Sequence, residues 1–138
     1  MNDETRKSIE NKIEFLEGRI IIWTELAKPT KAALEIFEKK LEDHIDLKEN
    51  YLMIFNLLDV KKGPASEIRY KLKDIFDKYR GNLTHGCVVL NTNKLLELTA
   101  KLVMRKYFKS VSIHRSMESA LEYASVNFKK QIEPLCQQ

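Results

Sequence analysis

Histidine, cysteine and glycine carry many catalytic, metal-binding and phosphate-binding motifs, but this chain has none of the known spacings. Its three histidines, His44, His85 and His114, are isolated from one another, whereas metal ligands often recur as HxxxH or CxxC. The four glycines form neither GxGxxG nor GxxxxGKS/T, the loops that cradle phosphates, and no GxSxG elbow presents a nucleophile. The sequence therefore predicts no metal site, no cofactor and no catalytic centre.

Another set of polar residues could bind a ligand or a partner, because each residue follows a predicted strand. In open parallel sheets, ligands bind beyond the carboxyl ends of the strands. The same residue types also form turns and cap helices, so a structural role is the alternative for each one. The residues of this predicted ligand or partner edge are Asp59, Ser66, Asn91, Thr92, Asn93, Arg115 and Ser116.

Five short apolar segments have the pattern of β-strands. Segment 12–16 alternates apolar and polar residues, which indicates a half-buried strand at a sheet edge. Segments 19–24 and 51–56 are apolar on both faces, as is typical of interior strands. The remaining two strands are expected at 86–90 and 111–114.

Helical periodicity follows each strand from the second onward, and each helix has a recognisable start. The starts are at Pro29-Thr30, Pro64, Asn91-Thr92-Asn93 and Ser116. A tight reversal at Glu17-Gly18 makes the first strand antiparallel, whereas helical crossovers make the other four parallel. We expect Phe76 and Leu121 to be buried in helix–sheet contacts.

The predicted fold is therefore α/β, with a single five-stranded mixed sheet and four helices. No linker or low-complexity stretch interrupts the chain, so residues 1–138 are expected to form one domain. Residues 1–10 are polar and are interpreted as a frayed segment or a short helix. Residues 129–138 are expected to fray.

Composition restricts the possible partners. The net charge of +4 results from 24 basic and 20 acidic residues in alternation, and nucleic-acid binders usually gather their basic residues on one face. No apolar run approaches the roughly 20 residues that cross a bilayer. The polar start and the two distant cysteines favour a cytoplasmic location. We therefore expect no nucleic-acid partner and no membrane insertion.

The helix expected between 94 and 108 is apolar over roughly 200° of its circumference. A helix that covers one side of a sheet needs a narrower stripe. Burial between neighbouring helices is one explanation, and contact with a second molecule is the other. We predict a homodimer to which this helix or the neighbouring sheet edge contributes. The residues assigned to that interface are Lys101, Met104, Arg105 and Phe108.

The segments FNLLDV (55–60), SEIRYKL (66–72), HGCVVLN (85–91) and VSIHRSMESALEYA (111–124), after an antiparallel first strand, resemble the STAS superfamily. The resemblance covers about residues 12–125, and the founding members of that family are bacterial anti-sigma-factor antagonists. It implies a regulatory protein that binds a protein partner. The family's phosphoacceptor motif, Asp-Ser-Ser-Gly, falls here on Pro64-Ala65-Ser66-Glu67, so the phosphoacceptor serine is replaced by Ala65.

The leading interpretation is a non-enzymatic regulatory protein-interaction module of STAS-like type that lacks the usual phosphoacceptor serine. The alternative is a small-molecule or lipid-binding domain that uses the carboxyl ends of the strands. An anion would then bind there, near the helix N-termini.

Overall fold

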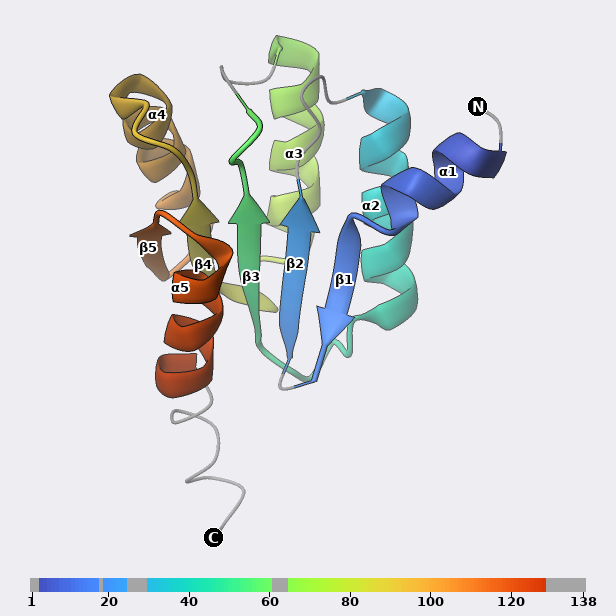
Figure 1. Ribbon diagram of the computed structural model, residues 1–138. Coiled ribbons are helices and arrows are strands. Elements are labelled where there is room, and N and C mark those ends of the chain that lie inside the picture. The colour runs from blue at the N-terminus through green and yellow to red at the C-terminus, as the bar shows by residue number, and fades with distance from the viewer. Residues whose placement is uncertain (1–2, 18, 25–29, 61–64, 129–138) are drawn as a thin grey trace, which may run out of the picture.

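The computed structural model describes residues 3–17, 19–24, 30–60 and 65–128 (Figure 1). The predicted helix starts at Pro29 and Pro64, the glycine of the first reversal and residues 129–138 lie outside these ranges. The strands are β1 (Ile13–Leu16), β2 (Ile20–Thr24), β3 (Tyr51–Asn56), β4 (Leu83–Val89) and β5 (Ser110–His114). The helices are α1 (Asp3–Glu10), α2 (Lys31–His44), α3 (Ser66–Lys78), α4 (Lys94–Met104) and α5 (Met117–Tyr123), which continues into a π-helical segment, η1 (Ala124–Phe128).

The five strands form one mixed sheet in the order β1-β2-β3-β4-β5. The strand β1 is antiparallel to β2, and every other neighbouring pair is parallel. This arrangement confirms the predicted α/β fold class. The helices differ from the prediction in number, because α1 adds a fifth α-helix to the four expected.

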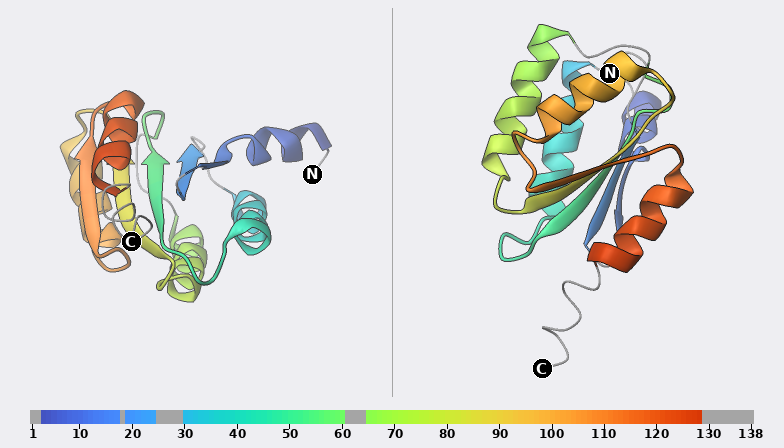
Figure 2. Two further views of the ribbon diagram at one scale, coloured as in Figure 1. Left: turned by 90° about the horizontal axis from the view of Figure 1, so that it is seen from below. Right: turned by 90° about the vertical axis from the view of Figure 1, so that its left-hand side faces the viewer.

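The helices cover the two faces of the sheet unequally. Helices α2, α3 and α4 lie on one face and α5 lies on the other (Figures 1 and 2). Alternate strand residues supply the two cores, because successive side chains of a strand point to opposite faces. Trp23 and Phe55 pack toward the face with three helices, whereas Ile22 and Ile54 pack toward Ala120 of α5.

Aromatic rings join the strands to the helices on the three-helix face. The ring of Trp23 stacks on Phe37 of α2, with centroids 4.2 Å apart. Phe55 contacts Phe76 of α3 at 5.8 Å and Phe108 at 5.9 Å, in both cases edge to face. Phe76 and Phe108 also contact each other at 5.6 Å. The core on this face is therefore held together by rings from five separate segments.

The N-terminal helix α1 packs against the edge of this core. Ile9 is buried there, and the Nζ of Lys40 on α2 donates hydrogen bonds to the carbonyl oxygens of Glu10 and Ile13 at 2.6 and 2.7 Å. Of the two interpretations for residues 1–10, the short helix is the one that the structure shows. Within the described ranges, the chain contains no helix that is both long enough and apolar enough to cross a membrane.

Candidate functional site

Two of the seven predicted edge residues lie together at the carboxyl ends of β4 and β5. The guanidinium of Arg115 donates to the carbonyl oxygen of Asn91 at 2.8 Å and to the carboxylate of Glu97 at 2.9 Å. The Asn91 amide donates to the carbonyl oxygen of Leu58, 2.7 Å away. These bonds connect the loops after β3 and β4 to α4 and to the end of β5, so the group has a structural role.

Asn93 and Ser116 are helix caps. The Asn93 side chain accepts from the Leu96 amide at 3.1 Å at the start of α4. The Ser116 hydroxyl accepts from the Ser119 amide, also at 3.1 Å, at the start of α5. Each satisfies one of the amide groups that the first turn of a helix leaves without an internal partner.

Alanine at either cap is expected to lower the free energy of unfolding by about 1 kcal/mol. The measurement is urea denaturation of Asn93→Ala and Ser116→Ala beside the wild type. Ser116→Thr and Asn93→Asp serve as controls, since both new side chains can accept the same hydrogen bond and should retain most of the stability. Equal losses in the alanine and the conservative variants would contradict the assignment as caps.

The remaining three edge residues are exposed and do not join a common cluster. Ser66 is the first residue of α3, and its hydroxyl accepts from Arg69 at 3.2 Å. Within the described part of the chain, the side chains of Asp59 and Thr92 have no hydrogen bond or ion pair. The predicted edge is therefore dispersed over caps, turns and one small polar group instead of forming a single site.

The helix assigned to an oligomer interface has a different orientation from the one that the sequence predicts. Met104 and Phe108 are only 6% and 4% exposed, because both pack on the backbone of β4 at Gly86. A Cβ atom at position 86 would lie 2.9 Å from the Met104 methyl carbon and 3.2 Å from the Phe108 ring. The two residues therefore belong to the core and do not form an exposed interface. Lys101 is half-buried and Arg105 is exposed.

The opposite side of α4 carries the apolar surface that faces solvent. Leu95, Leu98 and Leu102 are 76%, 55% and 57% exposed, and we call these three residues the leucine stripe. Their spacing of three and four residues places them on one side of the helix. The sequence predicts the excess of apolar surface on this helix, but the assignment of Met104 and Phe108 to the exposed side is wrong.

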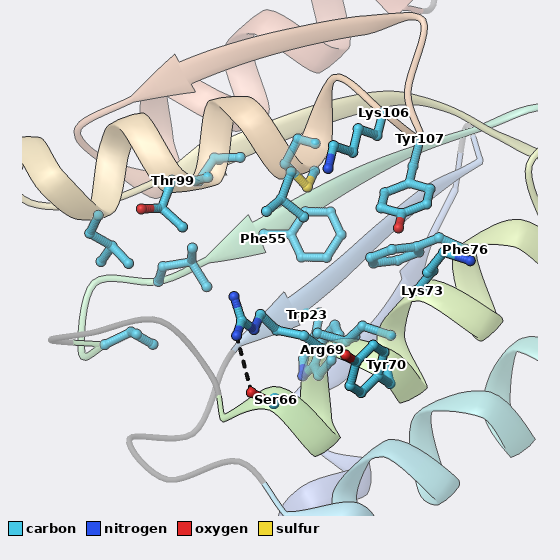
Figure 3. Close-up of a pocket in the computed structure, with 18 residues that line it drawn as sticks. Trp23, Phe55, Ser66, Arg69, Tyr70, Lys73, Phe76, Thr99, Lys106 and Tyr107 are labelled. Atoms are coloured by element: carbon cyan, nitrogen blue, oxygen red, sulfur yellow. Dashed lines mark hydrogen bonds between the residues drawn. The ribbon is translucent and has the colours of Figure 1, made fainter.

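A cavity of about 560 Å³ lies between α3 and α4, a size typical of small-molecule sites (Figure 3). Its floor includes Trp23, Phe55 and Val88, which come from three neighbouring strands and are all buried. Phe76 of α3 and Tyr107 also line the cavity, and their rings contact each other with centroids 5.4 Å apart. Toward the carboxyl ends of the strands, α4 contributes the small side chains of Thr99 and Ala100 to the lining. These side chains do not fill the space between the helices.

The polar residues that line this cavity are basic or uncharged. Arg69 and Lys73 come from α3 and Lys106 follows α4, and no acidic residue is among the described residues of the lining. Figure 3 shows Arg69 and Lys106 extending over the cavity from opposite sides. Of the predicted edge residues, Ser66 alone lines the cavity. The other lining residues come from segments far apart in the sequence, so no local sequence pattern indicates the site.

A chain of hydrogen bonds on the α5 side shows that His114 is not isolated. Its Nε2 lies 2.8 Å from the Ser112 hydroxyl, and its Nδ1 lies 2.8 Å from the hydroxyl of Ser119. Ser112 also donates to the Cys87 sulfur at 3.3 Å. Burial lowers the pKa of the His114 imidazole and raises the pKa of the Cys87 thiol.

A serine beside an imidazole suits nucleophilic catalysis when a carboxylate orients the ring. In this chain the hydroxyl of Ser119 occupies that position, and burial keeps the Cys87 thiol protonated. We therefore assign the chain of hydrogen bonds a structural role, joining β5 to α5 and β4. Among the described residues, no three His, Cys, Asp or Glu side chains are grouped so that they could hold a metal ion.

Comparison with known proteins adds no assignment to this geometry. Neither a protein-family model nor a curated protein matches the chain. The likeness to the STAS superfamily therefore stays a prediction from the sequence. Among the described residues, the leucine stripe and the cavity between α3 and α4 are the surfaces that we consider for function.

Proposed function

We propose that this chain is a non-enzymatic, cytoplasmic regulatory module that binds another protein through the leucine stripe. The proposal is supported by the exposure of all three leucines of the stripe. The other side of the same helix is already packed in the core through Leu96 and Met104, so the leucines are not needed there. An apolar surface on a packed helix is stabilised when a partner removes it from water. The STAS resemblance, which implies a regulatory protein partner, agrees with this function.

The charges beside the stripe indicate the chemistry of the partner. At 100° per residue, Lys94, Lys101 and Arg105 all fall on one side of the three leucines. Glu97 is the one acidic residue of α4, and it is already bonded to Arg115. A surface with leucines and a basic border suits an amphipathic helix with an apolar face and acidic flanks. We propose a partner helix of this kind.

Self-association, which the sequence predicts, is a less suitable use of the same surface. In an antiparallel pair of α4 helices related by a two-fold axis, the basic side of one copy faces the basic side of the other. Like charges at that border oppose the pairing. Sedimentation equilibrium at micromolar concentration distinguishes the two cases. If the wild type is a dimer and Leu98→Glu makes it monomeric, the partner of the leucine stripe is a second copy of the chain and not an acidic helix.

The direct test measures binding of labelled helical peptides by fluorescence anisotropy. One peptide carries leucines at heptad spacing with glutamates on both flanks, and a second has lysines in place of the glutamates. We expect the acidic peptide alone to bind, more weakly at high salt because ions screen the basic border. Leu98→Glu together with Leu102→Glu should reduce its affinity at least about tenfold, since a tenfold change corresponds to roughly 1.4 kcal/mol.

The matched control is Leu47→Glu. Leu47 is 76% exposed, as is Leu95, but it lies in the connection between α2 and β3. This variant should bind the acidic peptide as the wild type does. Equal binding of both peptides, or equal losses at Leu47 and in the leucine stripe, would refute the proposed surface.

A further inference from the structure

We propose that the cavity between α3 and α4 binds a small amphipathic anion, with a hydrocarbon or aromatic body and one carboxylate or phosphate head group. This inference goes beyond the proposed function, because it uses the side of α4 that faces α3 and not the leucine stripe. It rests on three observations: the apolar floor, the excess of basic groups at the mouth and the volume enclosed.

The floor and walls of the cavity suit a hydrocarbon. Trp23, Phe55, Val88, Leu96 and Met104 line it and are all less than a tenth exposed. A hydrocarbon body in contact with them would itself be removed from water, which favours binding in proportion to the apolar area of the ligand. A ligand that is polar throughout would instead lose its hydration without gaining hydrogen bonds on this floor. The floor therefore selects for an apolar ligand body.

The mouth of the cavity selects the charge of the ligand. The Arg69 guanidinium donates to the hydroxyl of Ser66, which leaves other donors of the same group available. Lys73 is in an exposed ion pair with Asp77, with 3.3 Å between nitrogen and oxygen. Within the described residues, Lys106 has no carboxylate partner. Arg69 and Lys106 are therefore the two cations of the lining without a carboxylate partner among the described residues, and no described lining residue is acidic, so the mouth attracts an anion and repels a cation.

Geometry places the head group between α3 and the residues that follow α4. In Figure 3 Arg69 lies on the α3 side of the cavity and Lys106 on the α4 side, with Phe55 between them in that view. An anionic head held between these two groups would leave its hydrocarbon body in contact with Trp23 and Phe55. Carboxylate and phosphate share the required charge, and the experiment separates them. The volume of about 560 Å³ suits a small molecule better than a long lipid.

Trp23 provides the measurement, because it is the single tryptophan of the chain and forms part of the floor. The probes are decanoate, decyl phosphate, decanol and inorganic phosphate, each titrated below its micelle concentration while tryptophan emission is recorded. We expect one or both of the amphipathic anions to bind at least about tenfold more tightly than decanol at low salt, because charged hydrogen bonds add to the same apolar contact. Inorganic phosphate should not compete at equal concentration.

Two kinds of variant locate the site. Lys106→Gln and Arg69→Gln should each weaken binding of the anion roughly two- to fivefold, the loss expected for one partly exposed ion pair. Ala100→Phe, which fills the cavity, should remove binding. Lys109→Gln is the control, because Lys109 is exposed and is not among the lining residues. Its affinity for the anion should equal that of the wild type.

The two glutamine variants keep the test valid if Ala100→Phe fails to fold, because Arg69 and Lys106 are both exposed. The proposal would be overturned if decanol bound as tightly as both anions. It would also be overturned if the affinity for the anion were the same in Lys106→Gln, Arg69→Gln and Lys109→Gln. The absence of any emission change with every probe would overturn it as well. Whichever of decanoate and decyl phosphate binds more tightly identifies the head group. None of these outcomes bears on the binding of helical peptides by the leucine stripe.

Discussion

Replacing Phe76 with alanine is expected to lower the free energy of unfolding by about 3–5 kcal/mol. The Phe76 ring is 4% exposed and contacts Phe55, Tyr107 and Phe108, so it joins α3 to the sheet and to the segment after α4. Alanine would leave a void among these rings, next to the existing cavity. The loss combines the transfer of the ring to water with the cost of that void.

The matched variant for this prediction is Leu121→Ala. The sequence predicts that Leu121, like Phe76, is buried in a helix–sheet contact, but the structure shows Leu121 36% exposed on α5. Its removal should change the free energy of unfolding by less than about 1 kcal/mol, as for other surface substitutions. Urea denaturation of both variants measures the difference. Similar losses at the two positions would contradict the description of this core.

The double substitution Met104→Glu with Phe108→Glu is expected to unfold the subunit. Both side chains pack on Gly86 in the core, where a carboxylate would lose its hydration and gain no partner. A buried polar group without a partner costs several kcal/mol, and a buried charge costs more. Domains of this size are stable by about 5–15 kcal/mol, so two such changes remove most or all of that stability. The sequence alone assigned both residues to an exposed interface, where the same two changes would leave the subunit folded.

Far-UV circular dichroism and sedimentation velocity measure the outcome of this substitution. The control is Leu98→Glu with Leu102→Glu, which places the same two charges on the exposed side of the same helix. The control should retain the wild-type spectrum and compact sedimentation. A folded Met104→Glu, Phe108→Glu protein would show that α4 does not pack through those residues.

Helix α4 connects the two proposed sites while keeping them physically separate. The leucine stripe lies on its solvent side, whereas Ala100 and Val103 of the same helix line the cavity. Both surfaces lie beside basic residues, but the cations differ: Lys94, Lys101 and Arg105 border the stripe, and Arg69, Lys73 and Lys106 line the mouth of the cavity. Substitutions at the two sites can therefore be made and measured independently.

The sequence by itself determined the order and direction of the elements, because those depend on local patterns. Alternation along 12–16 predicted a half-buried edge strand, which the structure shows as β1 at Ile13–Leu16. The helix caps at Asn93 and Ser116 were predicted from residue types that bond within their own first turn. The short reversal after β1 and the helical crossovers then determined which strands are antiparallel and which are parallel.

The orientation of α4 was decided by tertiary structure, because its apolar residues surround most of the helix and periodicity could not assign a buried side. The deciding residue is Gly86, whose missing side chain leaves room on β4 for Met104 and Phe108. Once those two residues pack there, the leucine stripe faces solvent. On α5 the small side chains of Ala120 and Ala124 make the buried contact, which leaves Leu121 on the outer side.

Long-range pairing likewise decided which polar groups meet. The register of β4 with β5 pairs Cys87 with Ser112, and the period of two along β5 places His114 on the same face as Ser112. The cavity requires β2, β3, β4, α3 and α4 to be assembled before its lining residues come together. Local patterns carry no information about such contacts, because these residues are neighbours in space and not in sequence. Only the packed structure therefore shows the apolar floor and the basic mouth as one site.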